Sequence, residues 1–248
     1  MIRTILLLMF WAIALPLASL FCFPWTLLTR DVTLLYRVFM WGAARGVRLV
    51  GIRTTVIGME KLDPARTYIY MSNHASNIDP PLMIPLIPKR TSVLVKQEVF
   101  KIPLLATAMR WGSLVPVDRG NREAGIEAVR AASAVVQQGL NMTIYVEGGR
   151  SVDGKLRPFK KGPFYLAMEC NVPVVPVTIS GTHYVMPKGR FAIKPGKVKV
   201  IFHDPIAPQD FGSRENLMEK VRRAIDRGLP PELQEILTAQ GSAGSQVV

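Results

Sequence analysis

The chain has 248 residues, of which 49% are hydrophobic, and it carries a formal net charge of +13 at pH 7. This length fits one domain with an appendage, and a basic chain this apolar favours an anionic membrane surface over nucleic acid. Its two cysteines, Cys22 and Cys170, have no metal-ligand neighbours, so neither a zinc site nor a disulfide framework is expected.

Residues 4–28 contain no charged side chain. A helix of that length would measure about 38 Å, enough to cross a hydrocarbon core of about 30 Å. Pro16 and Pro24 interrupt the run, so a straight helix is not expected. A cleaved signal peptide is the alternative, because Arg3 precedes the run and residues 14–19 weakly resemble a cleavage site. Nothing downstream has the character of a secreted protein.

Residues 34–51 form a second apolar stretch, in which Arg37, Arg45 and Arg48 alternate with aliphatic and aromatic residues. This pattern predicts an amphipathic helix in the lipid headgroup layer, with a surface helix packed on the domain as the alternative. Residues 1–50 are therefore expected to form a two-helix membrane motif. The arginines that follow the first run predict an inner-membrane protein whose active domain lies on the cytoplasmic side.

Residues 51–239 alternate short strand-like runs with helical patterns, which predicts an α/β domain with a largely parallel sheet flanked by helices. The strand-like runs are residues 53–58, 67–72, 92–96, 113–118, 142–147, 172–180 and 197–203. The helical patterns cover residues 100–112, 121–138, 162–170 and 213–227, with Asn121 placed as a cap. Residues 240–248 are predicted to be a disordered tail.

A histidine and an aspartate stand five residues apart where the second strand ends. Asp79 before Pro80 predicts a helix start with the aspartate as N-cap, and that role alone could account for Asp79. His74 has no comparable packing role. If His74 lies in the turn before the helix, the chain doubles back and the two side chains can meet. Because no serine or cysteine stands in a nucleophile elbow, the pair predicts a base that activates a bound substrate hydroxyl directly.

Four blocks, in order, resemble the signature blocks of the glycerolipid acyltransferases, the 1-acylglycerol-3-phosphate acyltransferase family. Asn73 and His74 followed by Asp79 resemble the first block, and GSLVPVDR at 112–119 resembles the second. YVEGGRS at 145–151 resembles the third, usually written Phe-Pro-Glu-Gly-Thr-Arg-Ser, and VPVVPV at 172–177 resembles the fourth. With the amino-terminal helices, the likeness covers most of the chain.

The resemblance implies a lysophosphatidate acceptor, whose phosphate carries about two negative charges. Arg119 and Arg150 each follow a predicted strand, and such strand ends face the ligand crevice of an open parallel sheet. Arginine presents a planar fork of donors to phosphate, so both residues are expected to bind it. Either could instead be an ordinary surface arginine. The resemblance also makes Asn73 a substrate-binding residue.

The third block departs from the family at Val146, which replaces proline, and at Gly149, which replaces threonine. The lost hydroxyl leaves the identity of the acceptor open, whereas Gly148 and Gly149 still offer backbone N–H groups to an anion.

By resemblance, Glu147 contacts the acceptor or organises the loop that carries Arg150, with a buried structural carboxylate as the alternative. Lys160 would meet the phosphates of the acyl carrier or a lipid headgroup, or be a solvated surface charge. His183 and His203 have no partner in the sequence pattern and are interpreted as structural.

The activity implied is transfer of a fatty acyl chain from acyl-CoA or acyl carrier protein to the free hydroxyl of 1-acyl-glycerol-3-phosphate, giving phosphatidic acid. His74 would take the hydroxyl proton and Asp79 would hold the imidazole, with no metal and no cofactor besides the thioester cosubstrate. Alternatives are another lyso-lipid acceptor, such as lyso-ornithine lipid, and a non-catalytic membrane lipid-binding protein. Nucleic acid is not an expected partner, because the basic residues are scattered and no aromatic stacking module is present.

Overall fold

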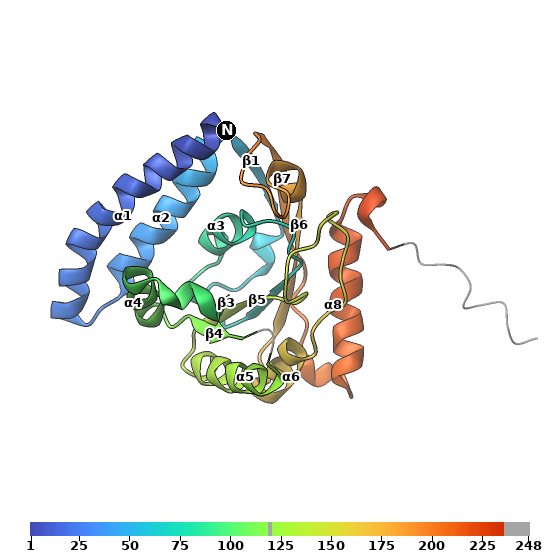
Figure 1. The fold of residues 1–248 in the computed structure, drawn as a ribbon. Coiled ribbons are helices and arrows are strands. Elements are labelled where there is room, and N and C mark those ends of the chain that lie inside the picture. The colour runs from blue at the N-terminus through green and yellow to red at the C-terminus, as the bar shows by residue number, and fades with distance from the viewer. Residues whose placement is uncertain (119–120, 236–248) are drawn as a thin grey trace, which may run out of the picture.

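The computed structural model describes residues 1–118 and 121–235 as a sheet with helices on both faces (Figure 1). Within these residues, seven strands form one sheet in the order β1-β7-β6-β2-β5-β3-β4. All neighbouring strands are parallel except β6 and β7, which are antiparallel. The predicted α/β class with a largely parallel sheet is therefore confirmed. Arg119 and the predicted tail at 240–248 lie outside the described residues.

The predicted strands are all present, with shifted ends. They are β1 (Ile52–Ile57), β2 (Ile69–Ser72), β3 (Thr91–Lys96), β4 (Val115–Val117), β5 (Asn141–Tyr145), β6 (Val174–Ser180) and β7 (Gly196–Phe202). The strand expected from residue 113 begins only at Val115, because Ser113 adopts a left-handed turn with φ of 62°.

Helices fill most of the connections between strands. They are α1 (Ile2–Thr29), α2 (Thr33–Leu49), α3 (Asp79–Met83), α4 (Pro103–Trp111), α5 (Arg122–Gln137), α6 (Gly162–Cys170), α7 (Thr182–Val185) and α8 (Arg214–Gly228). Single 3₁₀ turns are η1 (Met59–Lys61), η2 (Ile84–Leu86), η3 (Gln97–Lys101), η4 (Pro208–Asp210) and η5 (Pro231–Leu233). Asn121 caps α5 as predicted, since its side chain accepts the Glu123 and Ala124 N–H groups.

The core has two halves because side chains on each strand alternate between the faces of the sheet. On the face toward α2 and α3, Tyr70 belongs to the same buried cluster as Val47 and Leu82. On the other face, Met71 and its neighbours pack with residues of α5, α6 and α8, such as Phe164 and Leu217. Each large apolar side chain buried in this way contributes roughly 1.5–3 kcal/mol to folding. The two halves hold the central strands, and with them the strand ends that carry polar residues, in fixed positions.

The helix α1 is continuous through Pro16 and Pro24, so the expectation that these prolines interrupt it was wrong. Each proline removes one backbone hydrogen bond, and a long helix in apolar surroundings keeps its form because no other local structure would satisfy the remaining groups. The helix lies along α2, where Gly42 and Gly46 leave room for it: a Cβ at Gly46 would stand 3.0 Å from the Leu7 side chain. Arg3 also ties the start of α1 to the domain by donating to the Val50 carbonyl oxygen at 2.9 Å.

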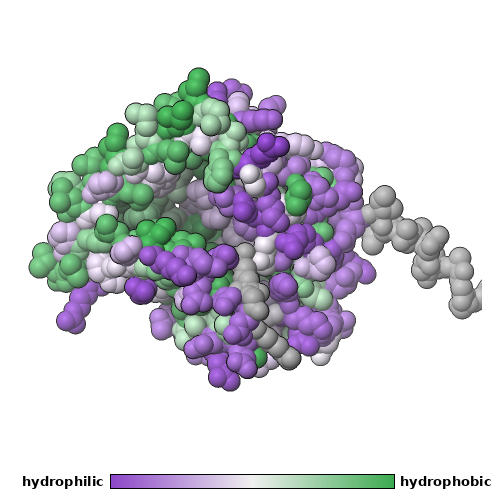
Figure 2. All heavy atoms as spheres, in the orientation of Figure 1, coloured by the Kyte–Doolittle hydropathy of each residue, from purple (hydrophilic) through white to green (hydrophobic). Residues whose placement is uncertain are grey.

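Among the described helices, α1 alone is long and apolar enough to cross a membrane, and 6% of its most apolar window is buried. Leu8, Leu20 and Phe21 each expose more than half of their surface, whereas a soluble core helix would cover them. Figure 2 shows apolar residues gathered over the side of the molecule formed by α1 and α2, with hydrophilic residues over the opposite side. The length and exposed apolar surface of α1 suggest that the chain associates with a membrane.

Candidate active site

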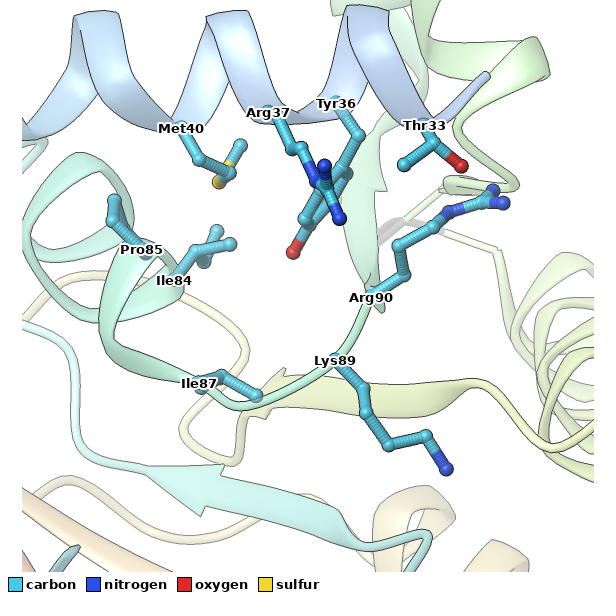
Figure 3. A pocket seen from close by; sticks show the side chains of 9 residues that line it. All are labelled: Thr33, Tyr36, Arg37, Met40, Ile84, Pro85, Ile87, Lys89 and Arg90. Carbon is cyan, nitrogen blue, oxygen red and sulfur yellow. The ribbon is translucent and has the colours of Figure 1, made fainter. Parts of the chain in front are cut away.

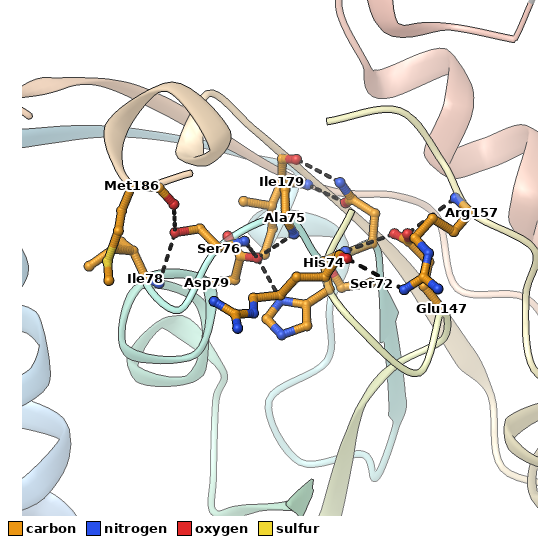
Figure 4. A network of polar contacts seen from close by, with 12 residues as sticks. Ser72, His74, Ala75, Ser76, Ile78, Asp79, Glu147, Arg157, Ile179 and Met186 are labelled. Atoms are coloured by element: carbon orange, nitrogen blue, oxygen red, sulfur yellow. Dashed lines mark hydrogen bonds and ion pairs between the residues drawn. The ribbon is translucent and has the colours of Figure 1, made fainter. Parts of the chain in front are cut away.

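His74 and Asp79 meet in the turn between β2 and α3. The strand ends at Ser72, the chain doubles back, and the Nδ1 atom of His74 lies 2.7 Å from Oδ2 of Asp79 (Figure 4). The imidazole is 10% exposed and the carboxylate 0%. The predicted proximity of the two side chains is confirmed. A ligand can reach the ring, while the carboxylate is shielded from water.

Asp79 is not the N-cap of α3, as the sequence suggested, but its first residue. The N-cap is Ile78, and no side chain caps the helix. An N-cap side chain accepts the N–H of the second or third helical residue. For Asp79 the second would be Pro81, which has none, and the Leu82 N–H already donates to the Ile78 carbonyl oxygen at 3.1 Å. The carboxylate turns backward instead, and its Oδ2 accepts the N–H groups of Ala75 and Ser76, both at 2.8 Å.

This arrangement fixes which nitrogen of His74 is available for chemistry. Three donors converge on one oxygen of Asp79, so the carboxylate cannot rotate freely. With Nδ1–H donating to that carboxylate, the neutral ring presents Nε2 as the proton acceptor. The same contact holds the imidazole ring in one orientation.

Asn73 and Ser76 anchor the same turn to distant parts of the chain. The Asn73 side chain donates to the Ile179 carbonyl oxygen and accepts the Ile179 N–H, both at 2.8 Å, which joins the end of β2 to β6. The Ser76 hydroxyl donates to the Met186 carbonyl oxygen at 2.8 Å. These bonds give Asn73 a positioning role, and its role as a substrate ligand stays a prediction.

Glu147 follows β5 and lies beneath the histidine turn. Its Oε1 accepts the His74 backbone N–H at 2.9 Å, and its Oε2 accepts the Arg157 N–H at 3.1 Å. The side chain is 2% exposed. Burial raises the pKa of Glu147 to about 7, although the two backbone hydrogen bonds oppose the rise. Of the roles considered from sequence, the contacts favour organising the loop over touching the acceptor.

The loop after Glu147 wraps back onto the histidine turn. Gly148 has a φ of 66°, and its N–H donates to the Tyr145 carbonyl oxygen, so this N–H is not free for an anion. Lys160 N–H donates to the Val146 carbonyl oxygen at 2.8 Å, and the Lys160 side chain covers Gly148. Lys160 is an exposed residue. The hydrogen bond between Lys160 and Val146 thereby joins the two ends of the loop that follows β5.

Arg150 is half-buried and immediately precedes Ser151, whose N–H donates to the His74 carbonyl oxygen at 2.7 Å. The Arg150 carbonyl oxygen accepts from Nη1 of Arg157 at 3.4 Å. The backbone at Arg150 therefore adjoins the histidine turn. Whether its guanidinium or that of Arg119 holds a phosphate stays a prediction, and Arg119 lies outside the described residues.

Tyr145, the last residue of β5, was assigned no role from the sequence. Its ring stacks on the His74 imidazole with centroids 4.2 Å apart. The signal was present, because Tyr145 occupies the aromatic first position of the third block. Over the described residues, no group of three or more His, Cys, Asp or Glu residues is arranged to hold a metal ion.

Comparisons with known proteins identify the family of the chain. The acyltransferase family model matches residues 53–180. A 1-acyl-sn-glycerol-3-phosphate acyltransferase of Cocos nucifera is 32% identical over 209 residues, covering 83% of this chain and 68% of the relative. A 1-acyl-sn-glycerol-3-phosphate acyltransferase of Limnanthes alba is 33% identical over 201 residues, which cover 81% of this chain and 70% of the relative.

A solved structure of an acyltransferase is also similar to this chain. The crystal structure of the 1-acyl-sn-glycerophosphate (LPA) acyltransferase PlsC from Thermotoga maritima is 31% identical in sequence, with a TM-score of 0.79. The match covers 92% of this chain and 95% of that one. The similarity to this acyltransferase thus extends over nearly the whole fold, including the amino-terminal helices. The chain belongs to the glycerolipid acyltransferase family, as its four sequence blocks predicted.

Proposed function

We propose that the chain transfers a fatty acyl group from acyl-CoA or acyl carrier protein to the free hydroxyl of 1-acyl-glycerol-3-phosphate, giving phosphatidic acid. The observation that carries the proposal is the 2.7 Å contact between His74 Nδ1 and Asp79 Oδ2, which leaves Nε2 as the base. The names of the relatives, all from enzymes of this kind, support the acceptor.

The proposed reaction is a direct transfer. Nε2 of His74 takes the proton of the acceptor hydroxyl while the oxygen attacks the thioester carbonyl carbon. The tetrahedral oxyanion then collapses, the carbon–sulfur bond breaks, and the leaving thiolate takes the proton back from the imidazolium. Asp79 stabilises the charged ring between the two proton transfers. General base catalysis of this kind is worth about 10²–10⁴ in rate.

The acceptor phosphate is proposed to meet cations beside the histidine. The backbone of Arg150 adjoins the His74 turn, and Lys160 lies over Gly148 at the base of the same loop. Arg119 completes the proposed set by its place in the second block. Holding the phosphate would place the acceptor hydroxyl for attack, and such positioning can contribute more to the rate than the base does.

The membrane helices suit substrates that live in a bilayer. The exposed apolar surface of α1 would keep the chain where both lysophosphatidate and phosphatidate reside. The arginines that follow α1 in sequence support a location of the domain on the cytoplasmic side of the inner membrane. They are Arg30, Arg37, Arg45, Arg48 and Arg53.

A second acceptor is favoured by one observation, the glycine at position 149 where the family usually has threonine. Without that hydroxyl, the loop has one polar group fewer for the headgroup, and a lyso-lipid such as lyso-ornithine lipid becomes a candidate.

Turnover by the purified protein in detergent separates these acceptors. The assay supplies lysophosphatidate, lyso-ornithine lipid and a lysophospholipid without a phosphate monoester, each with a panel of acyl thioesters, and identifies the lipid product. Phosphatidate as the main product supports the proposal. Preference for an acceptor without the phosphate monoester would replace it with the second one, and binding without turnover would refute both.

A further inference from the structure

A cavity of about 370 Å³ lies between α2 and the segment that joins α3 to β3 (Figure 3). A volume of this size suits a small ligand or a lipid headgroup. The cavity is lined by Thr33, Tyr36, Arg37, Met40, Ile84, Pro85, Ile87, Lys89 and Arg90. None of these residues belongs to the histidine–aspartate site.

The lining is divided by polarity. Figure 3 shows Arg37 and Tyr36 pointing from α2 into the space, with the Arg90 side chain rising toward Thr33. Met40, Ile84 and Pro85 lie together at the other side. A cationic end beside an apolar end is the polarity pattern of an anionic amphiphile, such as a phospholipid with its first acyl carbons.

Arg90 holds an unused donor in this cavity. Its Nε atom is buried and has no hydrogen-bond partner within the described residues. A buried donor of this kind costs roughly 1–3 kcal/mol when left unpaired, and more when charged. A phosphate oxygen would satisfy it, and the guanidinium fork is the side chain best matched to phosphate geometry.

Hydrogen bonds hold the backbone at Arg90 and Thr91. The Arg90 carbonyl oxygen accepts the Asn141 N–H at 3.1 Å. The Tyr36 hydroxyl accepts the Thr91 N–H at 3.3 Å, which leaves its own hydrogen free to donate to a ligand. The Tyr36 hydroxyl and the Arg90 backbone are therefore both tied to the sheet.

The charge balance of the cavity is positive. Lys89 is already engaged, because its Nζ donates to the Ala65 carbonyl oxygen at 2.9 Å. Asp31 lies nearby: hydrogen bonds from Thr33 lower its pKa most, and the charges of Arg90 and Arg37 lower it further. In the part of the chain that the structure describes, neither guanidinium forms an ion pair with a carboxylate. Two arginines against one carboxylate leave a net attraction for an anion.

The cavity and the catalytic pair lie at opposite ends of the strands. Arg90 precedes β3, whose first residue, Thr91, pairs with Asn141 at the start of β5. Tyr145, which stacks on His74, ends β5. The four residue steps from Asn141 to Tyr145 along β5 span roughly 13 Å.

We propose that this cavity is a second, non-catalytic phosphate-binding site, formed by Arg37, Arg90 and the Tyr36 hydroxyl, that takes the phosphate of an anionic phospholipid headgroup. The apolar end, beside Met40 and Ile84, receives the first carbons of the lipid. The site lies on α2, the helix that follows the membrane helix, so it would fix the helix pair to the headgroup layer.

The test measures retained lipid and thermal stability of the full-length protein in detergent. Native mass spectrometry, after exposure to phosphatidylglycerol, counts bound lipid for the wild type, for Arg37→Gln/Arg90→Gln and for Arg53→Gln/Lys199→Gln. The second pair is the matched control, since it removes the same charge from exposed residues on β1 and β7. Arg37→Glu is a further variant at an exposed position, where misfolding is not expected.

We expect the wild type and the control pair to retain one phosphatidylglycerol, and the cavity pair and Arg37→Glu to lose it, with apparent affinity at least tenfold lower. Melting curves with inorganic phosphate identify the source of the anion. Inorganic phosphate could raise the melting temperature of the wild type and the control pair but not of the cavity variants. If no lipid is retained in that case, the site binds free phosphate and not a lipid headgroup. Equal retention in all variants, or equal loss in the control and cavity pairs, would overturn the proposal.

Discussion

The ring of Tyr145 stacks on the imidazole of His74, with centroids 4.2 Å apart and an angle of 27° between the planes. Asp79 fixes one edge of the imidazole through Nδ1, and Tyr145 fixes one face. Burial raises the pKa of Tyr145 well above its ordinary value, with the Asp79 charge as the smaller cause, so the phenol stays neutral. Tyr145 therefore positions the His74 imidazole through the packing of its ring and not through its hydroxyl group.

Tyr145→Phe should keep acyl transfer close to the wild-type rate, because the stacked ring is retained. It should leave stability unchanged or raise it by about 1 kcal/mol, since the buried hydroxyl has no hydrogen-bond partner within the described residues. Tyr145→Ala should lower kcat by roughly 10–100-fold, because a misplaced base loses its attack geometry. Steady-state kinetics and thermal melts measure both effects. If the phenylalanine variant is as impaired as the alanine variant, the hydroxyl has a chemical role.

Titration of Glu147 should lower the free energy of unfolding as the pH rises from 4.5 to about 7. Its pKa is about 7 in the folded chain against 4.5 ordinarily, so between these values the folded state binds more protons than the unfolded state. The free energy of unfolding then decreases from pH 4.5 to 7 by an amount on the order of 3 kcal/mol and levels off above.

Glu147→Gln isolates this effect, because glutamine does not titrate. The variant has one carbonyl acceptor where the wild type has two carboxylate oxygens, so we expect an offset in stability at every pH. The difference between the two unfolding curves should nevertheless change across pH 4.5 to 7. Denaturant titrations at a series of pH values measure it, and parallel curves would contradict the assignment.

Gly148→Ala should destabilise the protein by about 1–2 kcal/mol, since an L-residue at φ of 66° is strained. The new Cβ would also lie 3.1 Å from carbon atoms of Lys160. Acyl transfer should fall by roughly tenfold or more, because the loop that holds the histidine turn shifts. Gly125→Ala is the control: it lies in α5 with no atom within 4 Å of the new Cβ, and it should stabilise by roughly 0.5–1 kcal/mol. Equal effects of the two changes would show that the Gly148 backbone is not strained.

Leu17→Asp should weaken membrane partitioning by roughly 100-fold. The residue lies near the middle of α1 and is exposed, and an acidic side chain at the centre of a spanning helix costs about 2.5–3.5 kcal/mol. Ile126→Asp, on the exposed face of α5, adds the same charge outside the helix pair and should leave partitioning unchanged. Vesicle flotation measures the partitioning of both variants. Unchanged flotation of Leu17→Asp would show that α1 does not lie in the membrane.

The strands and most helices were predictable because their signals are local. Alternation marked the strands, and Asn121 before an amphipathic run marked the start of α5. The ends were predicted less well where backbone conformation decides them, as at the left-handed Ser113. The continuity of α1 through Pro16 and Pro24 depends on its surroundings, which periodicity does not describe.

The site was predictable where partners are close in sequence. His74 and Asp79 are five residues apart, so a turn suffices to join them. The bonds that hold this turn span far longer separations: Asn73 reaches Ile179, and His74 reaches Glu147. The stacking of Tyr145 on His74 is likewise set by the pairing of β2 with β5, which no local pattern encodes.

The most direct test of the proposed mechanism is the rate of phosphatidate formation by His74→Ala. Purified variant and wild type are given lysophosphatidate and an acyl thioester, and melting curves confirm that the variant is folded. Loss of Nε2 as the base predicts a rate lower by about 10²–10⁴. A folded variant that forms phosphatidate at the wild-type rate would show that the imidazole is not the base.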